Sequence, residues 1–530
     1  MPEPLTRVLF LGLDGGTTAV LKPGFERGWL PNLAELWRRS ASGSLRSSAP
    51  MVTPVAWTSF ATGSEPPEHG IHEFYYVDSL TKSIRPNDAT RVRTPTIWET
   101  LDAADRAVVS LNLPMTYPPS KIKGIVVAGS DAPGLDWAFA QCPDFAADVR
   151  RLIPEYTNAI VWKRRPRSLD ELRGQAALNR AIFRAQAEAA LLADREVDWS
   201  AMLVHFHNLD SLQHRLWPYL NVDDTGLDQP AWTDETVSCL KALDDSVGIL
   251  LELASRRRAA VIALSDHGFG PCRALVNVNG LLRRHGLQKG LAYGTRFRYR
   301  AHRIADRLRR WIDHHQAPGT ASARRRPRSI LGQVGCDWRR TVAYSPFGQL
   351  SGCVFLADDV RRNENASQRL RREIIDIFRE VRDPETDLKL FRDVFDVADR
   401  YDLDPVAEGV ADILALSADG YQAQAKWGVG VRDNLLEVDP DLPATHYLSG
   451  VVAIDAPGVR PGNRIDADLR DVAPTSLALL DLAIPSTMSG RVIQEAFVEP
   501  LAVERDLGAA RIAAERVLVP SGRSDFVETN

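Results

Sequence analysis

The sequence has few cysteines and no long hydrophobic run. Its five cysteines are an odd number, lie far apart and form no Cys-x-x-Cys pair. This argues against a disulfide framework or a thiolate zinc site and favours a reducing compartment. No window reaches about 18 consecutive apolar residues, so we expect no transmembrane helix. The early apolar run 8–13 is too short for a signal peptide, and the acidic Glu3 precedes it. These absences predict a cytoplasmic protein.

A strong excess of either charge is also absent. The 530 residues have a formal net charge of −4, with 44% hydrophobic and 25% charged residues, which is ordinary for a soluble globular protein. Length alone suggests about two to four domains. One segment departs from this balance: residues 281–330 have fourteen Arg and Lys against two Asp, about +12, which leaves the rest near −16. The chain as a whole is therefore not basic, and its excess of positive charge is confined to this segment.

The basic segment has two interpretations. Ile304, Leu308 and Ile312 are spaced by four and predict an amphipathic helix, followed by a flexible link over 317–329. One interpretation is a surface patch or lid for an anionic substrate, a nucleic acid or a membrane. The other, which we favour, is a solvated insertion whose apolar stripe packs on the core.

Outside this segment, buried strands alternate with helices. Continuous apolar, β-rich runs predict core strands at 6–13, 107–113, 124–128, 201–204 and 259–264. A Ser168-x-x-Glu171 capping box opens a long Ala-rich helix to about Ala193, and a second long helix is expected at 233–256. This alternation predicts an α/β fold with a mostly parallel sheet. Ligands of such sheets bind beyond the carboxyl ends of the strands.

Polar residues suited to metal binding lie at or near these strand ends. They are three aspartates, three histidines and a loop threonine, namely Asp14, Asp210, His214, Asp266, His267, His446 and Thr53. Each one alone has an ordinary structural explanation, such as a turn or a buried histidine with its hydrogen bonds made. Together they are a ligand inventory for two divalent ions. Carboxylate oxygen with imidazole nitrogen suits Zn²⁺, with Mn²⁺ as the alternative.

A two-ion site of this composition suits chemistry at phosphorus. Two ions about 4 Å apart can hold both the attacking and the leaving oxygen of an in-line displacement. A threonine hydroxyl on one ion loses its proton more easily than in water and becomes a nucleophile. The conjunction of these residues therefore predicts a phosphohydrolase.

The motifs around these residues extend the pattern along the chain. They are Gly12-Leu13-Asp14-Gly15, Thr53-Pro-x-x-x-Thr-x-x-x-Thr-Gly63, Pro66-x-x-His69-Gly70-Ile71, Asp210-x-x-x-His214, Asp266-His267-Gly268 and His446 before Gly450. With these motifs the chain resembles the alkaline phosphatase superfamily, and specifically its type I phosphodiesterase/nucleotide pyrophosphatase family. The similarity extends from about residue 6 to residue 495.

The resemblance implies a fold and a division of the ligands. The fold is an alkaline-phosphatase-like three-layer sandwich with a mostly parallel central sheet and an inserted basic helical segment. The expected parts are a catalytic core at 1–280 and 336–495, a basic insertion at 281–335 as a candidate lid or cap, and a C-terminal helix and disordered tail at 496–530. One zinc is assigned to Asp210, His214 and His446, and the other to Asp14, Thr53, Asp266 and His267.

One position departs from the family pattern. Nucleotide pyrophosphatases have an Asn shortly after His-Gly-Ile that helps to hold a phosphoryl oxygen, and here that place is Phe74. The contact must then come from elsewhere, and Asn112 and Tyr117 are the candidate substrate-binding replacements. A nucleotide diester substrate is less secure for the same reason.

The leading hypothesis is a two-zinc hydrolase that cleaves a phosphodiester or phosphoanhydride through a phosphothreonine intermediate. Its substrate would be a small phosphate ester, with a nucleotide as one candidate. The nearest alternatives are a phosphomonoesterase, a phosphonate hydrolase or a phosphoryl transferase of the same fold. An alternative of another class is a non-catalytic anion or nucleic-acid binder that uses the basic insertion, for which binding would depend strongly on salt.

Overall fold

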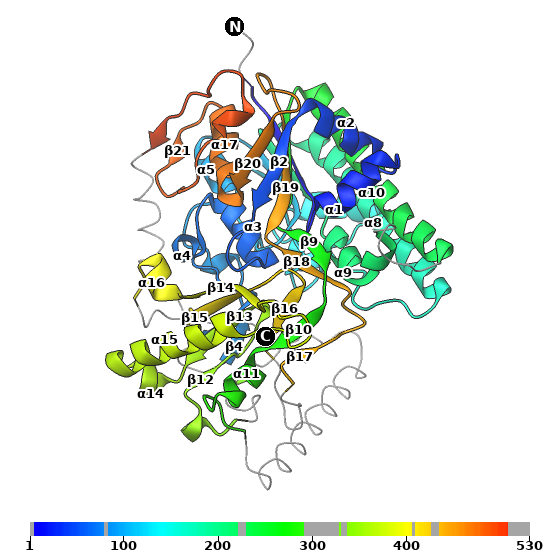
Figure 1. Cartoon of the computed structure of the whole chain (residues 1–530). Coiled ribbons are helices and arrows are strands. Elements are labelled where there is room, and N and C mark those ends of the chain that lie inside the picture. The colour runs from blue at the N-terminus through cyan, green and yellow to red at the C-terminus, as the bar shows by residue number, and fades with distance from the viewer. Residues whose placement is uncertain are drawn as a thin grey trace, which may run out of the picture. The chain divides into compact units, whose positions relative to one another are not determined.

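The computed structural model describes residues 5–78, 83–220, 229–290, 328–329, 336–404, 409–425 and 434–506. The chain divides into two compact units (Figure 1). The first unit comprises residues 1–71, 88–269 and 447–530, and the second comprises residues 72–87 and 270–446. Each unit is therefore built from segments that are far apart in the sequence.

The first unit is built on an eight-stranded sheet. Its order is β20 (Arg464–Asp468), β2 (Ala41–Arg46), β19 (Ser449–Asp455), β8 (Ala260–Leu264), β1 (Val8–Gly12), β7 (Ala201–His205), β5 (Val108–Leu113) and β6 (Gly124–Ala128). β19 is antiparallel to both of its neighbours, and the other paired strands are parallel. The predicted mostly parallel sheet is confirmed, and each of the five predicted core strands is present in it.

Helices cover both faces of this sheet. The long helices α8 (Leu169–Glu196) and α10 (Pro230–Arg257) pack on each other and contact the sheet on one side (Figure 1). On the other side, Val8 and Phe10 of β1 share a core with α3 (Thr53–Thr62), α5 (Ile97–Ala103) and α17 (Val472–Leu479). Because alternate strand residues face opposite sides, one strand supplies both cores. The result is the predicted three-layer α/β architecture.

Shorter helices complete the first unit. They are α1 (Thr18–Glu26), α2 (Pro31–Arg39), α4 (Pro66–His69), α6 (Leu135–Ala138), α7 (Pro143–Leu152) and α9 (Asn208–Leu220). Half of the predicted capping box of α8 is present: the Ser168 hydroxyl accepts a hydrogen bond from the Glu171 N–H, whereas the Glu171 carboxylate accepts one from the Arg167 N–H. The bond to Ser168 satisfies one of the amide groups that the first turn of a helix leaves free.

The second unit contains a mainly antiparallel sheet. Its order is β14 (Phe391–Asp396), β15 (Ile413–Ser417), β13 (Gln349–Leu356), β16 (Tyr421–Gln424), β10 (Ala274–Asn277) and β17 (Leu436–Glu437), with β12 (Ala343–Tyr344) paired to β13. The helices α11 (Val278–Arg284), α14 (Asp358–Arg361), α15 (Glu364–Glu380) and α16 (Val397–Tyr401) accompany it. α15 places the buried Arg371 against Asp396 and Asp412, so its charge is paired.

Part of the basic insertion and of the C-terminal tail lies outside the described residues. This includes the amphipathic helix predicted from Ile304, Leu308 and Ile312, and residues 507–530. The domain boundaries given above therefore stay predictions. Among the helices of the described residues, none is both long and apolar enough to cross a membrane.

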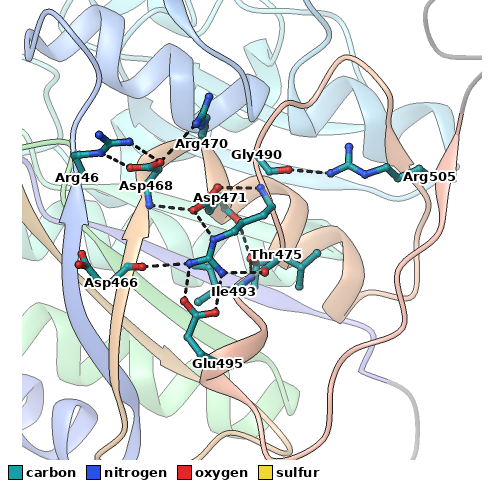
Figure 2. A network of polar contacts seen from close by, with 12 residues as sticks. Arg46, Asp466, Asp468, Arg470, Asp471, Thr475, Gly490, Ile493, Glu495 and Arg505 are labelled. Carbon is teal, nitrogen blue, oxygen red and sulfur yellow. Dashed lines mark hydrogen bonds and ion pairs between the residues drawn. The ribbon is translucent and has the colours of Figure 1, made fainter.

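A polar network joins the last part of the first unit to the edge of its sheet (Figure 2). Asp471 is 3% exposed and lies at its centre. Its carboxylate accepts hydrogen bonds from the backbone N–H groups of Asp468 (3.0 Å) and Arg491 (2.9 Å). Its carbonyl accepts one from the Thr475 hydroxyl, and the Thr475 hydroxyl in turn accepts one from the Ile493 N–H. The network thus ties residues 468–493 together.

We expect Asp471→Ala to lower the free energy of unfolding of the first unit by about 1–3 kcal/mol, because two partly buried backbone donors lose their acceptor. Urea titration followed by tryptophan fluorescence measures this loss. Asp466→Ala is the matched control: the residue is exposed and only its backbone carbonyl joins the network, so its effect should stay within about 0.5 kcal/mol. Equal effects of the two substitutions would contradict the assigned role.

Candidate metal centre

The site begins where β1 ends. β1 lies between β8 and β7 and is parallel to both, so the carboxyl ends of three strands meet at one edge of the sheet. Asp14 follows β1, Asp266 and His267 follow β8, and His205 ends β7. All four side chains are 0% exposed. The strand order therefore gathers polar groups from three distant parts of the sequence.

Two carboxylates of this edge point at one imidazole nitrogen. His267 Nε2 lies 3.6 Å from Asp14 Oδ1 and 3.2 Å from Asp266 Oδ2. Both carboxylate oxygens are buried without a hydrogen-bond donor among the described residues. A buried carboxylate oxygen without a donor is costly. An ion bound by these three atoms, which lie within 4.8 Å of one another, would remove that cost.

Asp210 and His214 are on α9, the helix that follows β7. They are four residues apart, which places them on the same helix face, and His214 Nε2 lies 3.6 Å from Asp210 Oδ1. Asp210 Oδ1 is also 3.9 Å from His267 Nε2. Five of the predicted ligands, those from Asp14, Asp210, His214, Asp266 and His267, are thus brought together in the first unit.

His446 and Thr53 complete the predicted set. His446 is 4% exposed and lies in β18 (Ala444–Tyr447), where it is the last residue of the second unit. Thr53 is 5% exposed and is the first residue of α3. Trp57, four residues further along α3 and so on the same face, packs edge-on against His205 with ring centroids 4.7 Å apart. Because His205 contacts Asp14, this packing directs the Thr53 face of α3 toward the end of β1.

Two glycines allow the close packing at this edge. A Cβ on Gly12 would lie 3.1 Å from both the His205 and the Trp57 rings. Gly15 has a φ of +68°, which favours glycine, and a Cβ there would lie 2.8 Å from Phe269. In this conformation the Gly15 N–H donates to Asp266 Oδ1 (3.1 Å) and its carbonyl accepts from Gln213 (2.9 Å).

The buried carboxylates have opposite electrostatic environments in the metal-free chain. Burial alone would raise the pKa of Asp14, but the neighbouring imidazoles of His205 and His207 outweigh it and hold this pKa well below its usual value. Burial, followed by the nearby charge of Asp14, raises the pKa of Asp266 well above its usual value. Two like charges this close are unfavourable without a cation, and a divalent ion would let both carboxylates ionise.

Sequence reasoning missed His205 and His207. Their rings contact Asp14 Oδ2, the carboxylate oxygen that does not face His267. His205 Nε2 lies 3.1 Å and His207 Nδ1 lies 2.8 Å from this oxygen. The available signal was His-x-His at the end of a buried strand, where a spacing of two places both side chains on one face.

The predicted substrate-binding residues have other contacts in the structure. Asn112 is 2% exposed, and its side-chain oxygen accepts a hydrogen bond from the Tyr156 hydroxyl (2.7 Å). Tyr117 is partly exposed, and its backbone N–H donates to Asp131. Phe74 lies in the second unit. A substrate contact by Asn112 or Tyr117 stays a prediction.

Comparison with known families identifies the chain. The family model described as type I phosphodiesterase/nucleotide pyrophosphatase matches residues 8–441, which is most of its length. The chain belongs to this family. Its members are metal-dependent phosphohydrolases, so the predicted family and enzyme class are confirmed. No curated protein sequence matches this member of the family.

Solved structures share the fold of this family member. Phosphonoacetate hydrolase from Sinorhizobium meliloti 1021, in complex with phosphonoformate, superposes with a TM-score of 0.55 at 17% identity, covering 90% of this chain and 97% of that one. Its complex with phosphonoacetate gives 0.54 with the same identity and coverage. Murine ectonucleotide pyrophosphatase/phosphodiesterase 5 gives 0.49 at 11% identity, covering 94% and 97%. The family match and the similarity to phosphonoacetate hydrolase confirm the alkaline-phosphatase-like architecture.

Proposed function

We propose that the chain is a two-zinc hydrolase that cleaves a phosphodiester or a phosphoanhydride by attack of Thr53. The observation that carries the proposal is the convergence of Asp14 Oδ1, Asp266 Oδ2 and Asp210 Oδ1 on His267 Nε2, at 3.6, 3.2 and 3.9 Å. Oxygen and nitrogen ligands at the carboxyl edge of a parallel sheet suit zinc, with manganese as the alternative.

The proposed ligands fall into two groups. Asp210, His214 and His446 would hold one ion, and the other would be held by Asp14, Thr53, Asp266 and His267. When bound, the two ions lower the pKa of a coordinated hydroxyl and offset negative charge that builds on the phosphoryl oxygens. The membership of His446 rests on the family pattern and on its burial.

The position of Thr53 at the start of α3 supports the proposed attack. Pro54 has no N–H, and the N–H groups of Val55 and Ala56 both donate to the Val52 carbonyl. Within the part of the chain that the structure describes, the Thr53 N–H has no backbone acceptor, so it can donate to a phosphoryl oxygen. The helix N-terminus also favours negative charge at this position.

The reaction has two steps. The Thr53 oxygen forms a bond to phosphorus as the bond from phosphorus to the leaving oxygen breaks, and the hydroxyl proton is lost to solvent. The leaving oxygen departs as an alcohol or phosphate after it takes up a proton. Water then attacks the phosphothreonine, which releases the phosphate product and restores the threonine hydroxyl.

Elemental analysis of purified protein, beside hydrolysis of bis-nitrophenyl phosphate and mono-nitrophenyl phosphate, tests the proposal. We expect at least two zinc ions for each chain and faster cleavage of the diester. Faster cleavage of the monoester would instead favour a phosphomonoesterase, and cleavage of phosphonoacetate would favour a phosphonate hydrolase. Protein that stays inert after zinc or manganese is added would overturn the proposal.

We also propose a cytoplasmic location. All five cysteines are free, and four of them are buried, which suits a reducing compartment. Cell fractionation tests this, and recovery in an extracellular fraction would contradict it.

The non-catalytic alternative is tested separately by deletion of residues 291–327. The deletion should leave diester cleavage intact, whereas an anion binder that uses this segment would lose its salt-dependent binding.

A further inference from the structure

We propose that Asp14, His205 and His207 form a third metal site, which takes a divalent transition metal ion. The inference rests on the proposed function, since the new site shares Asp14 with the two-ion centre. Asp14 directs one oxygen to each side: Oδ1 faces His267, and Oδ2 faces His205 and His207. A carboxylate can serve both sides because each oxygen has its own lone pairs.

The decisive atom is His205 Nε2. The other ring nitrogen, Nδ1, lies 3.0 Å from the backbone carbonyl oxygen of Asn112. A carbonyl oxygen only accepts hydrogen bonds, so Nδ1 carries the hydrogen and Nε2 of the neutral ring presents a lone pair. This lone pair is buried and lies 3.1 Å from Asp14 Oδ2, without a hydrogen bond among the described residues. Two acceptors at this distance repel each other unless a metal ion or a proton lies between them.

This arrangement is typical of a metal-binding histidine. Such a histidine usually donates its second ring N–H to a carbonyl or carboxylate, which fixes the ring and leaves the other nitrogen for the ion. His205 is held further by Trp57, which packs edge-on against it, and Asn112 is held by the Tyr156 hydroxyl. The ring is therefore rigidly oriented without any ion.

His207 supplies the third ligand. Its Nδ1 is hydrogen-bonded to Asp14 Oδ2 at 2.8 Å, a bond that the ion would replace, and the ligand atoms of the three residues lie within 4.8 Å of one another. Metal bonds of about 2.0–2.2 Å place neighbouring ligand atoms about 3–3.5 Å apart, so only small shifts are needed. The His207 side chain is 14% exposed, which leaves room for water as a further ligand.

The ligands define the class of ion. Two imidazole nitrogens and one carboxylate oxygen favour Zn²⁺, Co²⁺ or Mn²⁺ over Mg²⁺ and Ca²⁺, which prefer oxygen ligands. The competing explanation for the short contact of His205 with Asp14 is a proton on Nε2, which would leave this centre with two ions.

Metal counting on the full chain tests the inference. We expect purified protein, stripped with a chelator and reloaded with ZnCl₂, to bind three ions by elemental analysis, and His205→Gln and His207→Gln each to bind two. Glutamine can still donate a hydrogen bond to Asp14 but lacks the imidazole lone pair. His207→Gln alters a partly exposed side chain, which limits its effect on folding, and circular dichroism checks the fold of each variant. His285→Gln, at an exposed histidine of the second unit, is the control and should keep three ions.

The outcomes separate this inference from the proposed function. Two ions in the wild type and two in both variants would overturn the third site and leave the two-zinc hydrolase standing. Three ions in the variants, or a loss of more than one ion, would also overturn it, because the histidines would then not be ligands of one separate ion. A wild-type chain that binds no ion would overturn the proposed function itself.

Discussion

Thr53→Ala is expected to lower the rate of diester cleavage by about 10³-fold or more, while the bound zinc stays within one ion of the wild type. The methyl group removes the nucleophile and one metal ligand, but Asp14, Asp266 and His267 still converge on the same position. Initial rates on bis-nitrophenyl phosphate and elemental analysis of the same samples measure both quantities. Turnover like that of the wild type would contradict a phosphothreonine mechanism.

Two further variants show whether the hydroxyl at residue 53 is specific. Thr53→Ser keeps a hydroxyl on the first turn of α3 and should recover a large part of the lost rate. Thr58→Ala removes a hydroxyl from the same helix, but the Thr58 hydroxyl already donates to the Pro54 carbonyl (2.6 Å). Its rate should therefore stay within about tenfold of the wild type. A similar loss in Thr58→Ala would point to damage to α3 rather than to chemistry.

Removal of the metal is expected to abolish activity and also to destabilise the first unit. Without an ion, Asp14 and Asp266 lie buried beside each other, with Asp14 Oδ1 and Asp266 Oδ2 lacking any donor among the described residues. An ion that binds only the folded chain stabilises it by about 4 kcal/mol when its free concentration is 1,000 times the Kd. We therefore expect a clear fall in Tm on chelation, measured by differential scanning calorimetry.

Adding metal ions back to the chelated protein is the control for the loss of Tm and of activity. Zinc should restore both the Tm and the rate, with manganese next, whereas magnesium should restore neither, because imidazole ligands suit the transition metals. The pKa shifts of the two carboxylates predict opposite effects of pH, because burial and the charge of Asp14 raise the pKa of Asp266, and its ionisation therefore costs stability as pH rises. The pKa of Asp14 is low in the metal-free chain, so its favourable contacts exist above the usual aspartate pKa and are lost as pH falls through its own lower pKa. A Tm unchanged by chelation would contradict a metal centre between these carboxylates.

Several features of the molecule could be predicted because their causes are local. β1, β7 and β8 are continuous apolar runs, and such runs are buried on both faces of a parallel sheet. α8 begins where Ser168 supplies a hydrogen-bond acceptor to its first turn. Asp210 and His214 face each other because they are one helical turn apart. Each of these depends on neighbours in the sequence.

His205 and His207 could not be assigned in the same way. The contacts of these two side chains depend on the pairing of β7 with β1, in a register that places His205 opposite Gly12. That pairing carries the His205 ring to Asp14, 191 residues away in the sequence. Likewise, the Asn112 carbonyl reaches His205 only because β5 is the next strand in the sheet. The sequence shows that two histidines are present, but it does not show which residues they contact.

The sequence by itself therefore determined which residue types are available and which segments form strands and helices, since hydrophobic periodicity and capping act over a few residues. It also carried the family motifs from which the ligands were named. Only the tertiary structure decided the strand order β8-β1-β7-β5, which groups face each oxygen of Asp14, and which buried atoms lack a partner. These contacts arise when distant strands pair, and the packing that selects one pairing is a property of the whole core.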